Sequence, residues 1–290
     1  MDRGFSSVHP AVCFTYYIFI ILFAMLLFHP VYLLLSIAAQ AAFLLLHGRG
    51  RARGKSWVFF GLMGLAVLLI NPLINHRGST ILFYLFDNPI TLEATVYGAM
   101  LMLSLLDVLA VFACYQQVVD NHKFMYLFSS FLPKTAFLLM MCMRFVPLLL
   151  GRMKQISVVQ KTRGLDMTSG PVKKRSRDGM QILHILITWS LEEALQTADS
   201  MKARGYGVTK RSCYWDYKMG REDRVLLAAI LVLAAVTAAG SYLGYGTLAV
   251  YPTLGAVSFE PASLAFYGAF CLLLLIPIFV EGKEILLWRS

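Results

Sequence analysis

The chain has 290 residues, of which 58% are hydrophobic and 14% are charged, and its mean hydropathy is +0.66. Ordinary soluble domains are less apolar and about a quarter charged, so this composition excludes that class and predicts an integral membrane protein. The net charge of +10 does not indicate nucleic-acid binding, because no basic fold or zinc-finger pattern accompanies it.

Six apolar runs are long enough to cross a bilayer as helices, which takes about 17 to 25 residues each. They lie at 12–28, 30–46, 57–74, 95–116, 225–245 and 264–280. We therefore expect an all-α membrane fold with about six transmembrane helices. Residues 1–116 form the N-terminal transmembrane part, 225–290 form the C-terminal one, and 117–224 form a separate segment between them.

Basic residues are concentrated on one side of this map. Of the 26 Lys and Arg residues, 18 fall between Lys123 and Arg224, and a further group follows the second run. By the positive-inside rule, both regions are expected in the cytoplasm. This places the N- and C-termini in the cytoplasm too.

The segment 117–224 carries two long amphipathic patterns. Apolar residues recur every three or four positions from Pro133 to Arg163, which predicts one long helix. A second helix is expected from Asp178 to Arg204, with Asp178 as its N-cap and Gln181 three residues later. Between them, a turn at 169–171 precedes a basic run at 173–177, expected to be a loop facing lipid headgroups. We expect both helices to be cytoplasmic.

Both patterns end in nearly the same four residues. The first tip is Lys161, Thr162, Arg163 and Gly164, and the second tip is Lys202, Ala203, Arg204 and Gly205. Helices favour basic residues in the last turn and glycine after it, so either motif alone is explained as a cap. A guanidinium is also a rigid fork of donors that suits a carboxylate or carbonyl groups. Two such tips predict a partner with two similar grooves.

These motifs resemble those of a known family. KTRGLD and KARGYG correspond to paired Ala-Arg-Gly motifs, and LEEALQTADS, MRFVP and the segment from Asn71 to Gly98 also match. The chain resembles the transmembrane T component of energy-coupling factor (ECF) transporters, which is related to the membrane subunit of cobalt-type importers. It departs from the pattern at Thr162, where the family has alanine.

The resemblance implies a scaffold in the bacterial plasma membrane that couples two ABC-type ATPases to a substrate-binding S component, for uptake of a vitamin or metal ion. It implies no catalysis, cofactor or metal site in this chain, because ATP is bound by the partner subunits. The implied ATPase-binding residues are the two tips. The residues implied to face the S component lie on the apolar faces of the two long helices: Met140, Met143, Leu183, Ile187 and Leu191.

Two other functions remain open. An autonomous secondary transporter is expected to show inverted repeats, whereas the runs here divide four and two around the central segment. An intramembrane enzyme needs convergent catalytic side chains, and the histidines fall at unrelated depths. Asp107, within an apolar run, is either a proton or ion relay or a buried carboxyl bonded to a neighbouring hydroxyl.

Overall fold

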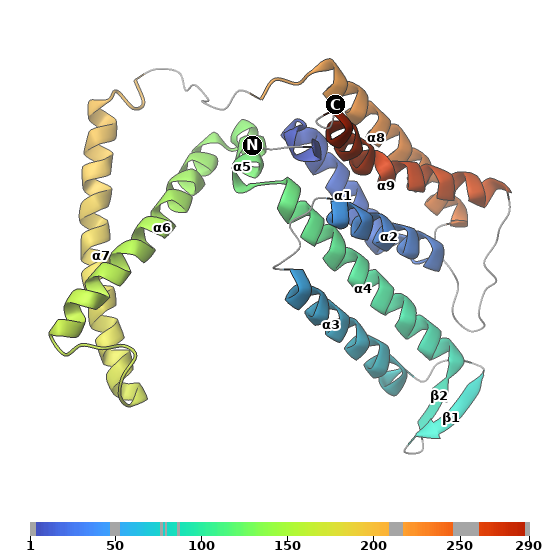
Figure 1. The fold of residues 1–290 in the computed structure, drawn as a ribbon, viewed down its shortest axis with the longest axis horizontal. Coiled ribbons are helices and arrows are strands. Elements are labelled where there is room, and N and C mark those ends of the chain that lie inside the picture. The colour runs from blue at the N-terminus through green and yellow to red at the C-terminus, as the bar shows by residue number, and fades with distance from the viewer. Residues whose placement is uncertain are drawn as a thin grey trace. The chain divides into compact units, whose positions relative to one another are not determined.

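The structure is a computed structural model that describes residues 4–46, 53–75, 78, 80–85, 88–208, 217–245 and 261–287. These residues are mostly helical, with one short two-stranded ribbon (Figure 1). The all-α membrane fold class is thereby confirmed. The chain divides into two compact units: unit 1 comprises residues 1–123 and 217–290, and unit 2 comprises residues 124–216.

Unit 1 is built around α4, which packs against α1, α2 and α3, while α9 packs against α2 and α8. These helices are apolar and bury aromatic side chains between them. The elements are a 3₁₀ turn η1 (Gly4–Ser7), α1 (Pro10–Leu26), α2 (Pro30–Leu46), α3 (Arg53–Ile74), β1 (Ile81–Leu85), β2 (Asn88–Thr91), α4 (Leu92–Val118), α8 (Arg221–Gly240), a wide turn η2 (Ser241–Tyr245) and α9 (Pro261–Leu287).

The N-terminal turn of unit 1 is held by charged side chains from distant segments. Phe5 is fully buried, and its N–H donates to the carboxylate of Glu281 on α9. The buried ammonium group of Lys123 donates to the carbonyl oxygens of Ser6 and Val118. Buried charges are stable only when hydrogen-bonded in this way. Both ends of the chain's first turn are therefore fixed to the helix bundle.

The segment from Asn71 to Gly98 folds as the end of α3, the antiparallel ribbon β1–β2 and the start of α4. The Asn71 amide donates to the carbonyl oxygen of Ala94 across the two helices at 2.9 Å. Thr91 caps α4 by accepting from the Ala94 N–H. The buried Glu93 carboxylate accepts from the N–H of Thr80. These bonds fix the ribbon against the beginning of α4.

Helices coincide with all six predicted runs, although only some are long. Among the described residues, α4, α8 with its extension to Gly244, and α9 are long and apolar enough to cross a membrane, whereas α1, α2 and the apolar part of α3 are shorter. The helix α6 (Pro133–Thr162) meets the same criterion of length and hydropathy. The amphipathic pattern had predicted a cytoplasmic helix there. The reason for the difference is that α6 carries only five charged residues, spaced so that an 18-residue window within it contains at most two of them.

Unit 2 contains most of α5 (Asn121–Phe131), together with α6 and α7 (Val172–Ala203). The helices α6 and α7 pack against each other (Figure 1). Two contacts between them are aromatic: the Arg152 guanidinium lies 4.5 Å from the centre of the Trp189 ring, and the rings of Phe137 and Tyr206 stack with centroids 5.3 Å apart. Cation–π and stacking contacts of this kind fix how the two helices face each other.

The predicted beginning of the second long helix is wrong. The structure begins α7 at Val172, with Pro171 as N-cap, so Asp178 lies within the helix and is not its cap. The Pro171 carbonyl accepts from the N–H groups of Lys174 and Arg175, which makes the basic run helical and not a loop. The first long helix, in contrast, agrees with its prediction, because α6 runs from Pro133 to Thr162.

Candidate functional site

The first tip ends α6 in a closed backbone turn. Gly164 adopts φ +82°, a left-handed conformation that glycine adopts without strain. The N–H of Gly164 donates to Lys161 O at 3.1 Å, and the N–H of Leu165 donates to Gln160 O at 3.1 Å. This pair of bonds is the Schellman motif, which satisfies carbonyl groups that a helix end leaves free.

The second tip repeats this geometry at the end of α7. Gly205 has φ +79°, its N–H donates to Lys202 O at 2.9 Å, and the N–H of Tyr206 donates to Met201 O at 3.0 Å. The arginines occupy equivalent positions, because Arg163 and Arg204 are the C-cap residues of their helices. The two tips therefore have the same backbone fold.

Neither arginine side chain contributes to these turns. The glycines and backbone N–H groups close both helix ends, while the side chains of Arg163 and Arg204 are exposed. Within the part of the chain that the structure describes, neither guanidinium has a hydrogen bond or an ion pair. Capping thus accounts for the glycines, and the two donor forks remain available for a partner.

The two tips lie at opposite ends of α7. The loop after the first tip contacts the beginning of that helix, since the Arg175 side chain donates to Met167 O at 2.8 Å. The second tip is the end of the same helix. With 32 residues and a rise of about 1.5 Å per residue, α7 separates the tips by roughly 45 Å. Two separate surfaces of a partner, or two partner subunits, are needed to reach both.

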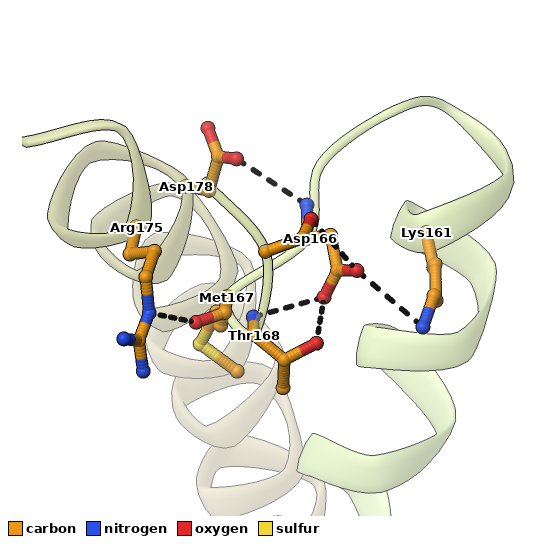
Figure 2. A network of polar contacts seen from close by, with 7 residues as sticks. Lys161, Asp166, Met167, Thr168, Arg175 and Asp178 are labelled. Atoms are coloured by element: carbon orange, nitrogen blue, oxygen red, sulfur yellow. Dashed lines mark hydrogen bonds and ion pairs between the residues drawn. The ribbon is translucent and has the colours of Figure 1, made fainter. Parts of the chain in front are cut away.

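The loop after the first tip is built around Asp166, as Figure 2 shows. Its Oδ1 accepts from the Thr168 N–H at 2.9 Å and from the Thr168 hydroxyl at 2.6 Å, and its Oδ2 accepts from the Ser169 hydroxyl at 3.0 Å. The ammonium of Lys161 lies 3.4 Å from the same carboxylate. The Thr168 bonds are the main reason that the pKa of Asp166 lies well below its usual range, with Ser169 and Lys161 adding to the effect.

The same loop is attached to α7. The backbone N–H of Asp166 donates to Oδ2 of Asp178 at 3.3 Å, and Asp178 is only 4% exposed. Sequence reasoning missed both aspartates as parts of this site. A local signal existed for Asp166, because Asp followed by Thr and Ser at the second and third positions is typical of an Asx turn. No local signal indicates Asp178, whose partner lies across the turn.

The five residues predicted to face an S component are all solvent-exposed in the structure. They are between 44% and 62% exposed: Met140, Met143, Leu183, Ile187 and Leu191. The contact between α6 and α7 is instead accompanied by burial of Ala136 and Ile182. Leu183, Ile187 and Leu191 follow one another at intervals of four, so they share one face of α7. An apolar stripe therefore remains uncovered on the long helices of unit 2.

Asp107 lies near the middle of α4 and is 1% exposed. Among the described residues neither carboxyl oxygen has a hydrogen-bond partner, and neither do the buried hydroxyls of Tyr16 and Ser36. The Ser36 side chain neighbours the carboxyl group, although no hydrogen bond joins them. The arrangement is that of a buried polar group with neighbouring hydroxyls, which is compatible with a structural role and with a relay.

Asp107→Asn separates these two roles. The amide has the same shape and adds a donor for the hydroxyls, whereas an unpaired charge at this depth is costly. We therefore expect the melting temperature in detergent to be unchanged or higher, and substrate uptake to be retained. A relay requires a group that binds and releases a proton, so loss of uptake at an unchanged melting temperature would support the relay instead.

The apolar helix bundle of unit 1 and the paired tips of unit 2 define a class: a helical membrane protein with two exposed cationic helix ends of the same backbone geometry. The comparisons with known proteins identify the family. The model described as "CbiQ: Cobalt transport protein" matches residues 5–215. The chain belongs to this family.

Curated relatives share part of the chain. A protein of Bacillus selenitireducens named energy-coupling factor transporter transmembrane protein EcfT is 34% identical over 110 residues, which are 38% of this chain and 41% of that protein. Proteins of the same name from Bacillus subtilis and Staphylococcus aureus are 33% and 29% identical over 102 and 103 residues, each 35% of this chain and 38% of the relative. The matched segment thus spans about two fifths of these relatives.

Proposed function

We propose that this protein is the non-catalytic T component of an ECF-type ABC importer, a membrane scaffold that couples two ATPase subunits to a substrate-binding S component. The observation that carries the proposal is the pair of exposed arginines, Arg163 and Arg204, on identical backbone turns at opposite ends of α7. Family membership and the names of the relatives support the same function.

In this proposal each tip enters the groove of one ATPase. The arginine donates a fork of hydrogen bonds to carboxylate or carbonyl groups there, and the glycine keeps the helix end narrow enough to enter. Lys161, Thr162 and Gly164 accompany Arg163, and Lys202, Ala203 and Gly205 accompany Arg204. ATP binding and hydrolysis belong to the ATPases, so this chain needs no cofactor of its own.

The S component is proposed to pack on the exposed apolar stripe of α6 and α7. Met140 and Met143 contribute adaptable side chains, and Leu183, Ile187 and Leu191 contribute one continuous face. Movement of the tips, driven by closure of the ATPase pair, would be transmitted along the helices to this stripe. The transported molecule, a vitamin or a metal ion, is held by the S component.

The proposed location is the bacterial plasma membrane, with both termini and both tips in the cytoplasm. Ser176 is exposed on α7 and offers a test of orientation. A cysteine placed there by Ser176→Cys, in a protein whose native cysteines are replaced, is expected to react with a membrane-impermeant maleimide only after the cells are opened. Labelling of intact cells from outside would show that the charge distribution was misinterpreted.

Affinity purification in mild detergent tests the proposed assembly most directly. We expect two ATPase chains and one small membrane protein to co-elute, and mass spectrometry of the eluate identifies them. Recovery of the protein alone, with substrate uptake intact in vesicles that contain no ATPase, would contradict the proposal and favour a secondary transporter.

A further inference from the structure

The two tips have the same sequence pattern and the same backbone turn, but their lysines differ. At the first tip, the ammonium of Lys161 lies 3.4 Å from the Asp166 carboxylate. At the second tip, Lys202 has neither an ion pair nor a hydrogen bond within the described residues. The residue that corresponds to Asp166 in position is Gly207, which cannot form such a pair.

From this difference, and on the basis of the proposed function, we propose that Asp166 is a positioning residue that makes the two tips unequal. It holds the first tip rigid and pairs with Lys161, so that of the two cations in the motif only Arg163 is without an ion-pair partner among the described residues. Among the described residues, neither cation of the second tip, Lys202 or Arg204, has an ion-pair partner.

The rigidity of the first tip follows from the bonds around Asp166. Its carboxylate accepts three hydrogen bonds from Thr168 and Ser169, and its N–H is bound by the buried carboxylate of Asp178 (Figure 2). A second bond, from Arg175 to Met167 O, attaches the loop to the first turns of α7. A tip that is already ordered loses less conformational freedom on binding, which slows dissociation of its partner.

The charge difference follows from the ion pair. Although exposed ion pairs contribute little to stability, they cancel the field that a partner meets. At the first tip the charges of Lys161 and Asp166 offset each other. At the second tip both cations of the motif act on the partner, so Lys202 is expected to contribute to the dependence of association on ionic strength.

The test uses variants in which only one tip can bind. Arg204→Glu leaves the first tip, and Arg163→Glu leaves the second. For each full-length protein in detergent, association and dissociation rates of the co-purified ATPases are measured across a series of NaCl concentrations. Lys161→Ala is then made in the Arg204→Glu protein, and Lys202→Ala is made in the Arg163→Glu protein as its matched partner.

We expect Lys161→Ala to slow association at the first tip, because it leaves the Asp166 carboxylate uncompensated, and we expect Asp166→Asn in the same protein to restore the association rate, because both charges of the pair are then removed. We expect Lys202→Ala to slow association at the second tip and to flatten its salt dependence. Failure of Asp166→Asn to restore association in the Lys161→Ala protein would overturn the charge assignment. If Arg163→Glu and Arg204→Glu themselves leave ATPase binding intact, the proposed function fails, which is a different outcome.

Substitutions of Asp166 separate its two effects at the first tip. Asp166→Asn can still form the Asx turn but releases Lys161, so a steeper salt dependence is expected with little change in dissociation rate. Asp166→Glu keeps the charge but is too long for the turn, so dissociation is expected to be roughly two- to tenfold faster at unchanged salt dependence.

The same substitutions in the protein that retains only the second tip are the control. They are expected to change nothing there, because Asp166 is far from Arg204 along α7. A general folding defect would slow or weaken both tips alike. Equal loss at both tips, or no effect of Asp166→Glu at the first, would overturn the role of Asp166 as a positioning residue.

Discussion

Arg163→Glu combined with Arg204→Glu is expected to abolish recovery of ATPases with this protein, while the protein remains folded in the membrane. Removal of one partner from a buried, charge-assisted contact commonly costs about 2–5 kcal/mol, and charge reversal costs no less. A basic residue that serves only the helix dipole contributes about 0.3–1 kcal/mol. Each single reversal is expected to weaken attachment and the double reversal to eliminate ATP-driven uptake. Quantitative immunoblotting of the purified complex measures this.

Two other exposed lysines provide the controls. Lys154→Glu and Lys174→Glu introduce the same change of charge on α6 and α7, outside the four residues of either tip. Both are expected to leave ATPase recovery close to that of the unmodified protein. If ATPases still co-purify at full yield after both arginines are reversed, the tips are only caps, and the docking surface lies elsewhere on residues 133–204.

Gly240→Leu is expected to destabilise unit 1 strongly. A Cβ atom at this position would lie 2.6 Å from two ring atoms of Phe266, where α8 packs against α9. Small residues allow helices to approach closely in membranes, and excess volume in a packed interface typically costs about 1–3 kcal/mol. We expect a lower melting temperature in detergent, and Gly240→Ala is expected to have a smaller effect in the same direction.

Gly268→Ala is the matched control on α9. No atom lies within 4 Å of the position that its Cβ would take, so the added methyl group meets open space. An alanine within a helix is also favoured over glycine, by up to about 1 kcal/mol. We expect the melting temperature to be unchanged or slightly higher. If Gly240→Ala and Gly268→Ala lowered the melting temperature equally, close packing of α8 against α9 at Gly240 would not be the cause of the loss.

Sequence reasoning located the features that depend on local interactions. The end of α6 and the positions of Arg163 and Gly164 could be predicted because a helix C-terminus is set by residues within one turn of it. The beginning of α7 could not, because the expected Asp178 cap competes with Pro171, and the basic run between them is compatible with either a loop or a helix. The hydrogen bonds of the Pro171 carbonyl decide in favour of the helix.

The contacts between α6 and α7 could not be predicted from the sequence. No sequence pattern indicates that the Arg152 guanidinium lies over the Trp189 ring and donates to Gln155. The stacking of Phe137 on Tyr206 joins residues that no periodicity relates. Both depend on how two helices are oriented about their axes, which is decided by packing along their whole length.

The loop that follows Arg163 is attached to the first turns of α7 through Asp178 and Arg175, and one uninterrupted helix of 32 residues leads from there to Arg204. The distance between the two arginines is therefore set by the number of residues in α7. One inserted residue in α7 would lengthen it by about 1.5 Å and turn the second arginine by roughly 100° about the helix axis, whereas seven inserted residues would restore the direction at a distance about 10 Å greater. Tolerance to insertions in α7 should consequently follow the period of the helix. After one inserted residue the second arginine points in the wrong direction for its ATPase. After seven it points in nearly the original direction, but it lies about 10 Å further from the first arginine.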